Sequence, residues 1–264
     1  MSHPPLIKTH VEAGIAEVRL NRPQAMNALS YALVEALSQE LDRLKLRDDI
    51  RVLLIRGEGR AFCAGGDLKF FREKVLARDA PGFRRFLEAC RDTFLKIEKF
   101  PCPTIAVVNG VTVAGGLELL LACDLAIAAE SAKIGDGHAR YGIVPGGGAA
   151  IRLPRKIPVS IAKYLLFTGG LFPARQWLEW GLVSEVAPDD ALDERVRQVC
   201  AAILRNSPLS MAVTKRLVND GLEQPLSTAL DSELLAWDAY TLSDDVLEGL
   251  NAFSEKREPA FRGR

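Results

Sequence analysis

The sequence carries no excess charge of either sign, because its 34 Lys and Arg residues balance its 34 Asp and Glu residues. Proteins that bind the nucleic-acid backbone or an anionic membrane surface usually show a basic surplus. We therefore expect neither nucleic acid nor a membrane as a partner. Any phosphate group on a ligand must then be bound by a local cluster of cations.

The sequence also lacks paired cysteines and long apolar runs. Its five cysteines are an odd number without a C-x-x-C pair, which argues against a disulfide framework and a zinc module. No apolar run reaches the length that crosses a membrane, and the first 20 residues lack the basic and apolar regions of a signal peptide. These absences predict a cytoplasmic globular protein.

Short β runs alternate with helical patterns through most of the chain. Two runs at 7–10 and 15–20 predict a hairpin, and apolar residues recur at helical spacing from Leu33 to Leu44. Three further runs, at 51–56, 104–108 and 124–128, are apolar enough for buried strands. This alternation predicts an α/β fold.

From Pro188 onward the β runs disappear. The pattern predicts helices over 191–205, 209–222, 225–242 and 244–256, with many apolar positions for so short a segment. A helical segment with surplus apolar surface usually covers the core or another subunit. We therefore predict a core that holds the active site over residues 1–200 and a helical oligomerisation region over 201–264.

Three glycine-rich stretches, at 61–67, 113–118 and 145–148, occupy strand-to-helix positions. None has the G-x-G-x-x-G spacing of dinucleotide sites or the Lys of a P-loop. Glycine permits close backbone approach and leaves N–H groups unshielded, so two such turns that face each other can hold a developing oxyanion. The alternative is that these glycines only make tight turns.

Three side chains near these stretches are candidates for chemistry. Glu118 lies one turn into a helix, between leucines, where a carboxylate suits general acid/base catalysis or simply favours the helix N-terminus. His138 is either a second catalytic group or a loop histidine bonded locally to Asp136, and no second His or Cys at ligand spacing supports a metal. Cys63 is expected to be a small buried hydrophobe, not a nucleophile.

Several motifs together resemble one family. They are AFCAGGDL (61–68), NGVTVAGGLELLLACD (109–124), RYGIVPGGGAAIRLPRKI (140–157), LNRPQAMNAL (20–29) and NAFSEKREP (251–259). In this order they resemble the enoyl-CoA hydratase/isomerase, or crotonase, superfamily over nearly the whole chain. The resemblance implies a spiral of ββα units with a helical C-terminal trimerisation region. It also implies a homotrimer or dimer of trimers, an acyl-CoA substrate, and no permanently bound cofactor besides the coenzyme A of the substrate.

The same resemblance implies roles for individual residues. The oxyanion hole maps onto the N–H groups of Ala64 and Gly115, and the first catalytic glutamate maps onto Glu118. Lys256 corresponds to the basic residue that reaches the CoA phosphates on a neighbouring subunit. The remaining expected substrate- and CoA-binding residues are Gln24, Ala25, Met26, Gly65, Gly66, Asp67 and Leu68.

One position departs from the family. His138 stands four residues before Gly142, where the hydratases carry a second glutamate. Related C–C bond hydrolases that act on cyclic β-diketones have a histidine there, together with an Asp where this chain has Gly147.

Three functions therefore remain open. The first is an enoyl-CoA hydratase or isomerase of fatty-acid or related acyl-CoA catabolism, with Glu118 and His138 as acid/base groups. The second is a C–C hydrolase in which His138 activates water, and the third is a non-catalytic acyl-CoA-binding protein. We expect the first, because it is the activity that the family resemblance implies. Glu118 argues against the third, because a binding protein has no need of a carboxylate among leucines.

Overall fold

The structure is a computed structural model that describes residues 4–264. A six-stranded sheet has the order β1-β2-β3-β5-β7-β10, and only the β1–β2 pair is antiparallel. The strands are β1 (Ile7–Glu12), β2 (Ile15–Leu20), β3 (Val52–Gly57), β5 (Thr104–Val108), β7 (Leu125–Ala129) and β10 (Glu185–Ala187). β5 is buried throughout and β3 almost throughout, which explains why both read as continuous apolar runs. The predicted hairpin and the three predicted buried strands are confirmed.

A second sheet joins four strands of three residues each, in the order β4-β6-β8-β9. They are β4 (Ala61–Cys63), β6 (Val111–Val113), β8 (Lys133–Gly135) and β9 (Leu171–Pro173). β4, β6 and β8 each follow a strand of the first sheet and precede a helical segment, so the chain winds in ββα repeats. The α/β fold class and the spiral of ββα units are confirmed, although such short strands escaped the sequence pattern.

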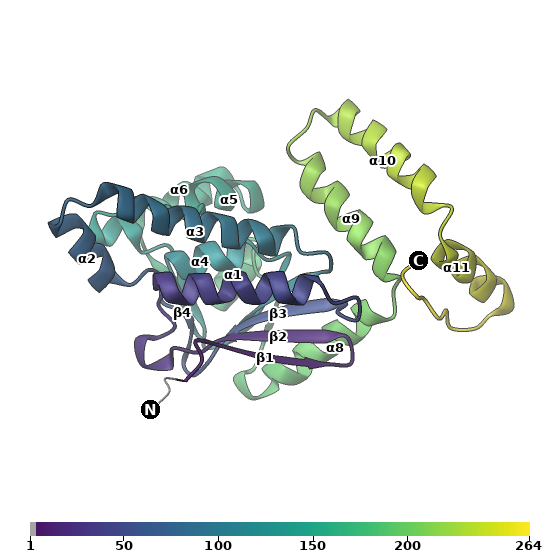
Figure 1. Cartoon of the computed structure of the whole chain (residues 1–264), viewed down its shortest axis with the longest axis horizontal. Coiled ribbons are helices and arrows are strands. Elements are labelled where there is room, and N and C mark those ends of the chain that lie inside the picture. Colours follow the sequence, from purple (N-terminus) through teal and green to yellow (C-terminus); the bar gives the residue numbers. More distant parts are fainter. Residues whose placement is uncertain (1–3) are drawn as a thin grey trace.

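Helices cover these sheets, and α1 runs beside α3 (Figure 1). The α-helices of this part are α1 (Tyr31–Lys45), α2 (Leu68–Leu76), α3 (Ala80–Glu98), α4 (Gly115–Leu121), α5 (Ala149–Lys156), α6 (Val159–Thr168), α7 (Ala174–Glu179) and α8 (Leu192–Leu204), with 3-10 turns η1 (Pro23–Ala25), η2 (His138–Tyr141) and η3 (Asp189–Ala191). Helix α1 begins where the hydroxyl of Ser30 accepts a hydrogen bond from the N–H of Leu33. Helix α4 is buried along its whole length, including the two glycines with which it begins.

Three further helices form an arm that projects from this core (Figure 1). They are α9 (Pro208–Gly221), α10 (Leu226–Tyr240) and α11 (Asp244–Glu255), which confirms the predicted helices to within three residues at each end. Asp245 fixes the end of the arm, because its buried carboxylate accepts hydrogen bonds from Ser207 and from the N–H groups of Arg262 and Gly263. Helix α8 packs on strands of the core, and α9 still contacts the core, since the ammonium of Lys215 pairs with Asp124 at 2.8 Å. The predicted division near residue 200 stays a prediction.

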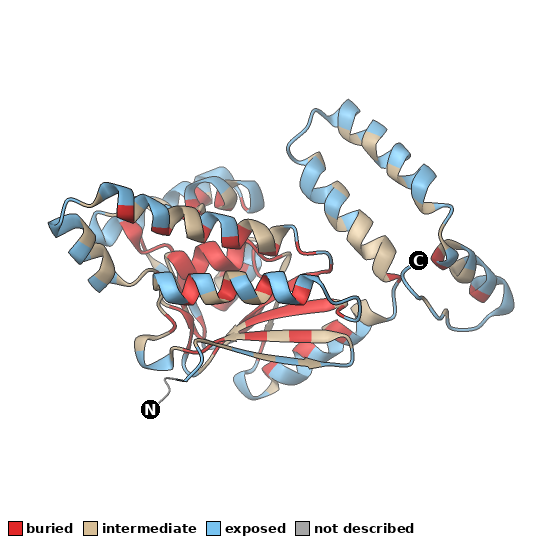
Figure 2. Cartoon of the chain, in the orientation of Figure 1, coloured by how far each residue is buried: buried red, intermediate tan, exposed pale blue. Residues whose placement is uncertain are grey.

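Most residues of α10 and α11 are exposed or only partly buried, and their ribbons are mostly pale blue in Figure 2. Leu235, Leu242 and Phe253 are 70%, 88% and 86% exposed. Nothing within residues 4–264 covers this surface. None of the helices in that range is long and apolar enough to cross a membrane.

Candidate active site

Glu118 lies in the first turn of α4, and the residue is only 4% exposed. Oε1 accepts hydrogen bonds from the N–H of Gly147 at 2.8 Å and of Ala149 at 3.0 Å, at the start of α5. These two donors and the helix dipole offset the cost of burying a carboxylate. Oε2 has no hydrogen-bond partner among the described residues, so it is the oxygen left to exchange a proton.

The loop that binds Glu118 is fixed by Arg152, which also forms an ion pair with Glu98. Arg152 donates one hydrogen bond to the carbonyl of Gly147 at 2.7 Å and two to the carboxylate of Glu98 at 2.6 and 3.0 Å. A Cβ on Gly147 would lie 2.5 Å from Oε2 of Glu118, so this close approach requires glycine. The Asp that the cyclic β-diketone hydrolases carry at this place does not fit beside the carboxylate as it stands here.

His138 is held by a buried carboxylate. Its Nδ1 lies 2.8 Å from Oδ1 of Asp136, and its backbone N–H donates to Oδ2 at 3.2 Å. Because Asp136 only accepts, the neutral imidazole has its proton on Nδ1 and an acceptor lone pair on Nε2. Burial lowers the pKa of His138, but the hydrogen bond and charge of Asp136, with the charge of Glu118, outweigh it and raise this pKa overall.

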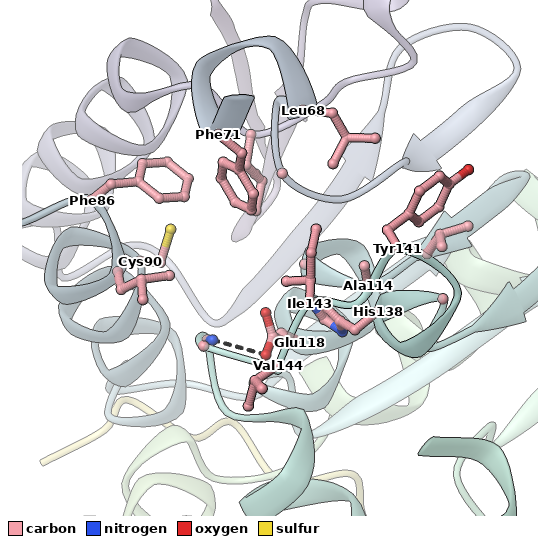
Figure 3. A pocket seen from close by; sticks show the side chains of 18 of the residues that line it. Leu68, Phe71, Phe86, Cys90, Ala114, Glu118, His138, Tyr141, Ile143 and Val144 are labelled. Atoms are coloured by element: carbon pink, nitrogen blue, oxygen red, sulfur yellow. Dashed lines mark hydrogen bonds between the residues drawn. The ribbon is translucent and has the colours of Figure 1, made fainter. Parts of the chain in front are cut away.

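Glu118 and His138 line the same pocket, although they are 20 residues apart in sequence. Figure 3 shows the two side chains next to each other, with Phe71, Phe86 and Cys90 across the pocket. His138 therefore both bonds locally to Asp136 and lines the pocket. The sequence left these two roles as alternatives, but in the structure the bond to Asp136 holds the imidazole that lines the pocket.

The oxyanion prediction needs a correction at one residue. The N–H of Ala64 donates to the carbonyl of Met26 at 3.0 Å, so it is already engaged. The neighbouring N–H groups do not replace it, because the N–H of Asp67 donates to the carbonyl of Leu29 and Gly65 does not line the pocket. Gly66 itself is left with an N–H that has no acceptor among the described residues.

The N–H of Gly115, the first residue of α4, is likewise without an acceptor in the described part of the chain. Gly66 and Gly115 both line the pocket, and a Cβ on Gly115 would lie 3.4 Å from the nitrogen of Gly66. The two turns approach this closely because Gly116 has no side chain, since a Cβ there would lie 2.0 Å from the carbonyl oxygen of Cys63. The pair of available donors is therefore Gly66 and Gly115.

The other predicted residues fall into three groups. Leu68 lines the pocket, whereas Asp67 caps α2 and pairs with Arg22 at 2.8 Å, which gives it a structural place. Gln24, Ala25 and Met26 form the η1 loop, which contacts the Gly-rich turn through the carbonyl of Met26. Lys256 ends α11, which lies far along the molecule from α2 in Figure 1, and it does not line the pocket of its own chain.

The cysteines show no sign of redox or nucleophilic use. All five (Cys63, Cys90, Cys102, Cys123 and Cys200) are free and buried. Burial raises the pKa of Cys63 to about 12, so this thiol stays protonated at neutral pH. The expectation that Cys63 is a buried hydrophobe is confirmed.

The fold and the site together define a crotonase-fold enzyme, with backbone donors and a carboxylate around one pocket. A model of the family "Enoyl-CoA hydratase/isomerase" matches residues 10–264, and the chain belongs to this family. It is an enzyme of the acyl-CoA hydratase/isomerase type.

Named relatives match along nearly the whole chain. A mitochondrial methylglutaconyl-CoA hydratase of Mus musculus is 37% identical over 95% of this chain and 80% of its own length. An enoyl-CoA isomerase/hydratase of Mycosarcoma maydis is 36% identical over 95% of this chain and 93% of its own. The crystal structure of an enoyl-CoA hydratase from Bacillus anthracis superposes with a TM-score of 0.93 at 37% identity, over 98% of this chain and all of that one.

Proposed function

We propose that the protein hydrates 2-enoyl-CoA thioesters, with the thioester oxygen bound between the N–H groups of Gly66 and Gly115. One observation carries this proposal: two N–H groups and one carboxylate oxygen, Oε2 of Glu118, share a pocket and have no hydrogen-bond partner within residues 4–264. Two backbone donors stabilise the enolate because its negative charge develops on the oxygen that they bind. Glu118 then transfers the proton, and His138 accepts a hydrogen bond from the attacking water.

Each proton has a stated place in this mechanism. Oε2 of Glu118 takes one proton from water while the water oxygen bonds to C3 of the substrate, and the C2=C3 electrons move into the enolate. The Nε2 lone pair of His138 accepts a hydrogen bond from the second hydrogen of that water, which stays on the product hydroxyl. Glu118 then returns its proton to C2, so the carboxylate is restored and one water has been added.

Double-bond isomerisation is the second candidate, because it needs only one base. Oε2 of Glu118 would remove a proton from C2 of a 3-enoyl-CoA and return it to C4 through the same enolate. Hydrolytic C–C cleavage would use His138, held by Asp136, as a base. A side chain at position 147 would clash with Glu118, however, so the aspartate of those hydrolases has no room there.

Purified protein incubated with crotonyl-CoA tests the proposal. We expect the mass of the product to rise by one water, and we expect His138→Ala to lose hydration while retaining any isomerisation of a 3-enoyl-CoA. Turnover of 3-enoyl-CoA without hydration of crotonyl-CoA would assign the isomerase reaction. Cleavage of a cyclic β-diketone without turnover of either thioester would refute both.

We further propose that the arm mediates a homotrimer or a dimer of trimers. The exposed leucines and Phe253 support this, because apolar surface of that extent usually marks a protein contact. In such an assembly Lys256 would bind the CoA phosphates on a neighbouring subunit. A cytoplasmic location stays a prediction, supported by five cysteines that are free and buried, and cell fractionation tests it.

A further inference from the structure

The pocket provides no cation for the part of the substrate beyond the thioester. Of its lining residues, only Glu118 and the titratable His138 carry charge, and none is a Lys or Arg. The rest of the lining is apolar side chain or glycine backbone, with the Tyr141 side chain at the mouth, 68% exposed. Any acyl group that enters therefore meets a hydrophobic surface and one negative charge.

The wall that faces Glu118 is aromatic. Phe71 of α2 stacks edge-on against Phe83 and Phe86 of α3, with ring centroids 4.8 and 5.6 Å apart and planes inclined by 76° and 73°. Leu87 and Cys90 continue this wall along α3. We call these five residues the acyl wall; Figure 3 shows Phe71, Phe86 and Cys90 opposite the reacting groups.

Cations close to the acyl wall in sequence are directed elsewhere. Lys74 of α2 pairs with Asp79 at 2.6 Å, and Arg84 of α3 pairs with Glu88 at 2.9 Å. Arg72 and Arg85, beside wall residues on α2 and α3, are exposed and do not line the pocket. None of these side chains stands where it would neutralise a carboxylate bound against the rings.

We infer that the enzyme selects acyl groups that are uncharged and apolar beyond C3, aliphatic or aromatic, and rejects those that end in a carboxylate. This inference rests on the proposed function, since it concerns the substrate of the same site. An apolar tail or ring would pack on the rings of the acyl wall and leave no polar group unsatisfied. A terminal carboxylate would lose its hydration without gaining a counter-ion, and Glu118 would repel it.

Two thioesters of five carbons test the selection directly. 2-Pentenoyl-CoA ends in a methyl group where glutaconyl-CoA ends in a carboxylate, and the rest of the acyl chain is comparable. We expect kcat/KM to be about 100-fold or more higher for 2-pentenoyl-CoA, since an uncompensated buried charge costs several factors of ten. Equal kcat/KM for both thioesters would overturn the inference.

Saturated thioesters separate this inference from the proposed reaction, because they cannot be hydrated. Titration calorimetry should show tighter binding of pentanoyl-CoA than of glutaryl-CoA, again by about 100-fold. If this preference holds while no enoyl-CoA is turned over, the proposed reaction fails and the selection stands. If glutaryl-CoA binds as tightly as pentanoyl-CoA while 2-pentenoyl-CoA is hydrated, the selection fails and the reaction stands.

A cation placed in the acyl wall should reverse the preference. Phe83 is only partly buried, so Phe83→Arg can keep its stem on the wall and point its guanidinium into the pocket. We expect the ratio of glutaryl-CoA to pentanoyl-CoA affinity to rise at least about tenfold. Val75→Arg adds the same charge to a side chain of α2 that is 71% exposed and outside the pocket, and it should leave the ratio unchanged. An equal rise in both variants would mean that overall charge, and not the acyl wall, sets the preference.

Discussion

Helices α4 and α10 place leucines in opposite environments. All seven residues of α4 are buried, whereas none of the fifteen residues of α10 is, as the red and pale ribbons of Figure 2 show. The surroundings of α4, including both partners of Glu118, come from one chain. Helix α10 packs chiefly on α9 of the arm among the described elements and leaves most of its leucines exposed. The difference teaches that the carboxylate of α4 is held by its own chain, whereas the apolar surface of the arm is left open for the proposed contact between subunits.

The largest effect should come from the carboxylate on α4. Glu118→Gln keeps the shape of the side chain and removes the base, so we expect turnover to fall by about 10²–10⁴, the usual contribution of a positioned acid or base. Steady-state kinetics with crotonyl-CoA measures the loss, and light scattering checks that the assembly is unchanged. Unchanged turnover on every accepted thioester would refute the mechanism.

The corrected oxyanion donor gives the next largest effect. Gly66→Pro removes the N–H while Gly66→Ala keeps it, and both variants place a Cβ against the flexible ring of Phe71. Loss of one such donor costs about 10²–10³ in kcat, so the proline variant should be slower than the alanine variant by that factor. If the two variants are equally active, the N–H of Gly66 does not bind the reacting oxygen.

A charge on the arm tests the other half of the comparison. Leu235 is 70% exposed on α10, and Leu235→Asp should dissociate the assembly, because the carboxylate would be buried at the contact. Light scattering measures the mass, and circular dichroism should show an unchanged fold. A wild-type protein that is monomeric at micromolar concentration would contradict the assembly altogether.

The pH dependence of hydration should follow the His138–Asp136 pair. Below the pKa of His138 the imidazolium has no lone pair on Nε2, so hydration should be lost as pH falls through that pKa, which lies above its ordinary value. Asp136→Asn removes the charge that raises this pKa, so the acid limb should move to lower pH while KM changes little. A pH profile of kcat/KM for both proteins measures the shift. An acid limb that stays in place would mean that His138 does not set it.

The smallest effect should be that of the cation at the end of the arm. Lys256→Ala should raise KM for CoA thioesters without changing kcat, because a phosphate contact stabilises the bound substrate and the transition state equally. The increase should be greater at low salt, where a surface charge is least screened. Arg262→Ala, a change of equal charge near the chain end, serves as the control. An unchanged KM at every salt concentration would remove Lys256 from the site.

Most helices and buried strands and the candidate carboxylate could be predicted from the sequence. Periodicity predicts helix α10, an apolar run predicts strand β5, and Glu118 is the one carboxylate among its neighbouring leucines. The one-residue error at Ala64 arose because the AGG run offers three adjacent N–H groups of similar character. Only the bond from Ala64 to Met26 and the place of Gly65 outside the pocket lining reveal which of them remains available.

The contact between Asp136 and His138 could be predicted from the sequence only in part. The sequence suggested a local bond to His138, but nothing in it indicated that both side chains would be buried together beside the pocket. The anchoring of Glu118 by Gly147, Ala149 and Arg152 had no sequence signal at all. These contacts join residues about 30 positions apart, where side-chain spacing carries no information.

The sequence by itself determined the α/β class, the family and the surplus of apolar residues at the C-terminal end, and it singled out Glu118 as the candidate carboxylate. These follow from hydrophobic periodicity and from short motifs, which are local properties of the chain. Only the tertiary structure decided which N–H groups are available, which oxygen of Glu118 is free and which side chains form the acyl wall. Each of these depends on which distant segments meet, because an N–H group or oxygen that is hydrogen-bonded in one contact is not available for another.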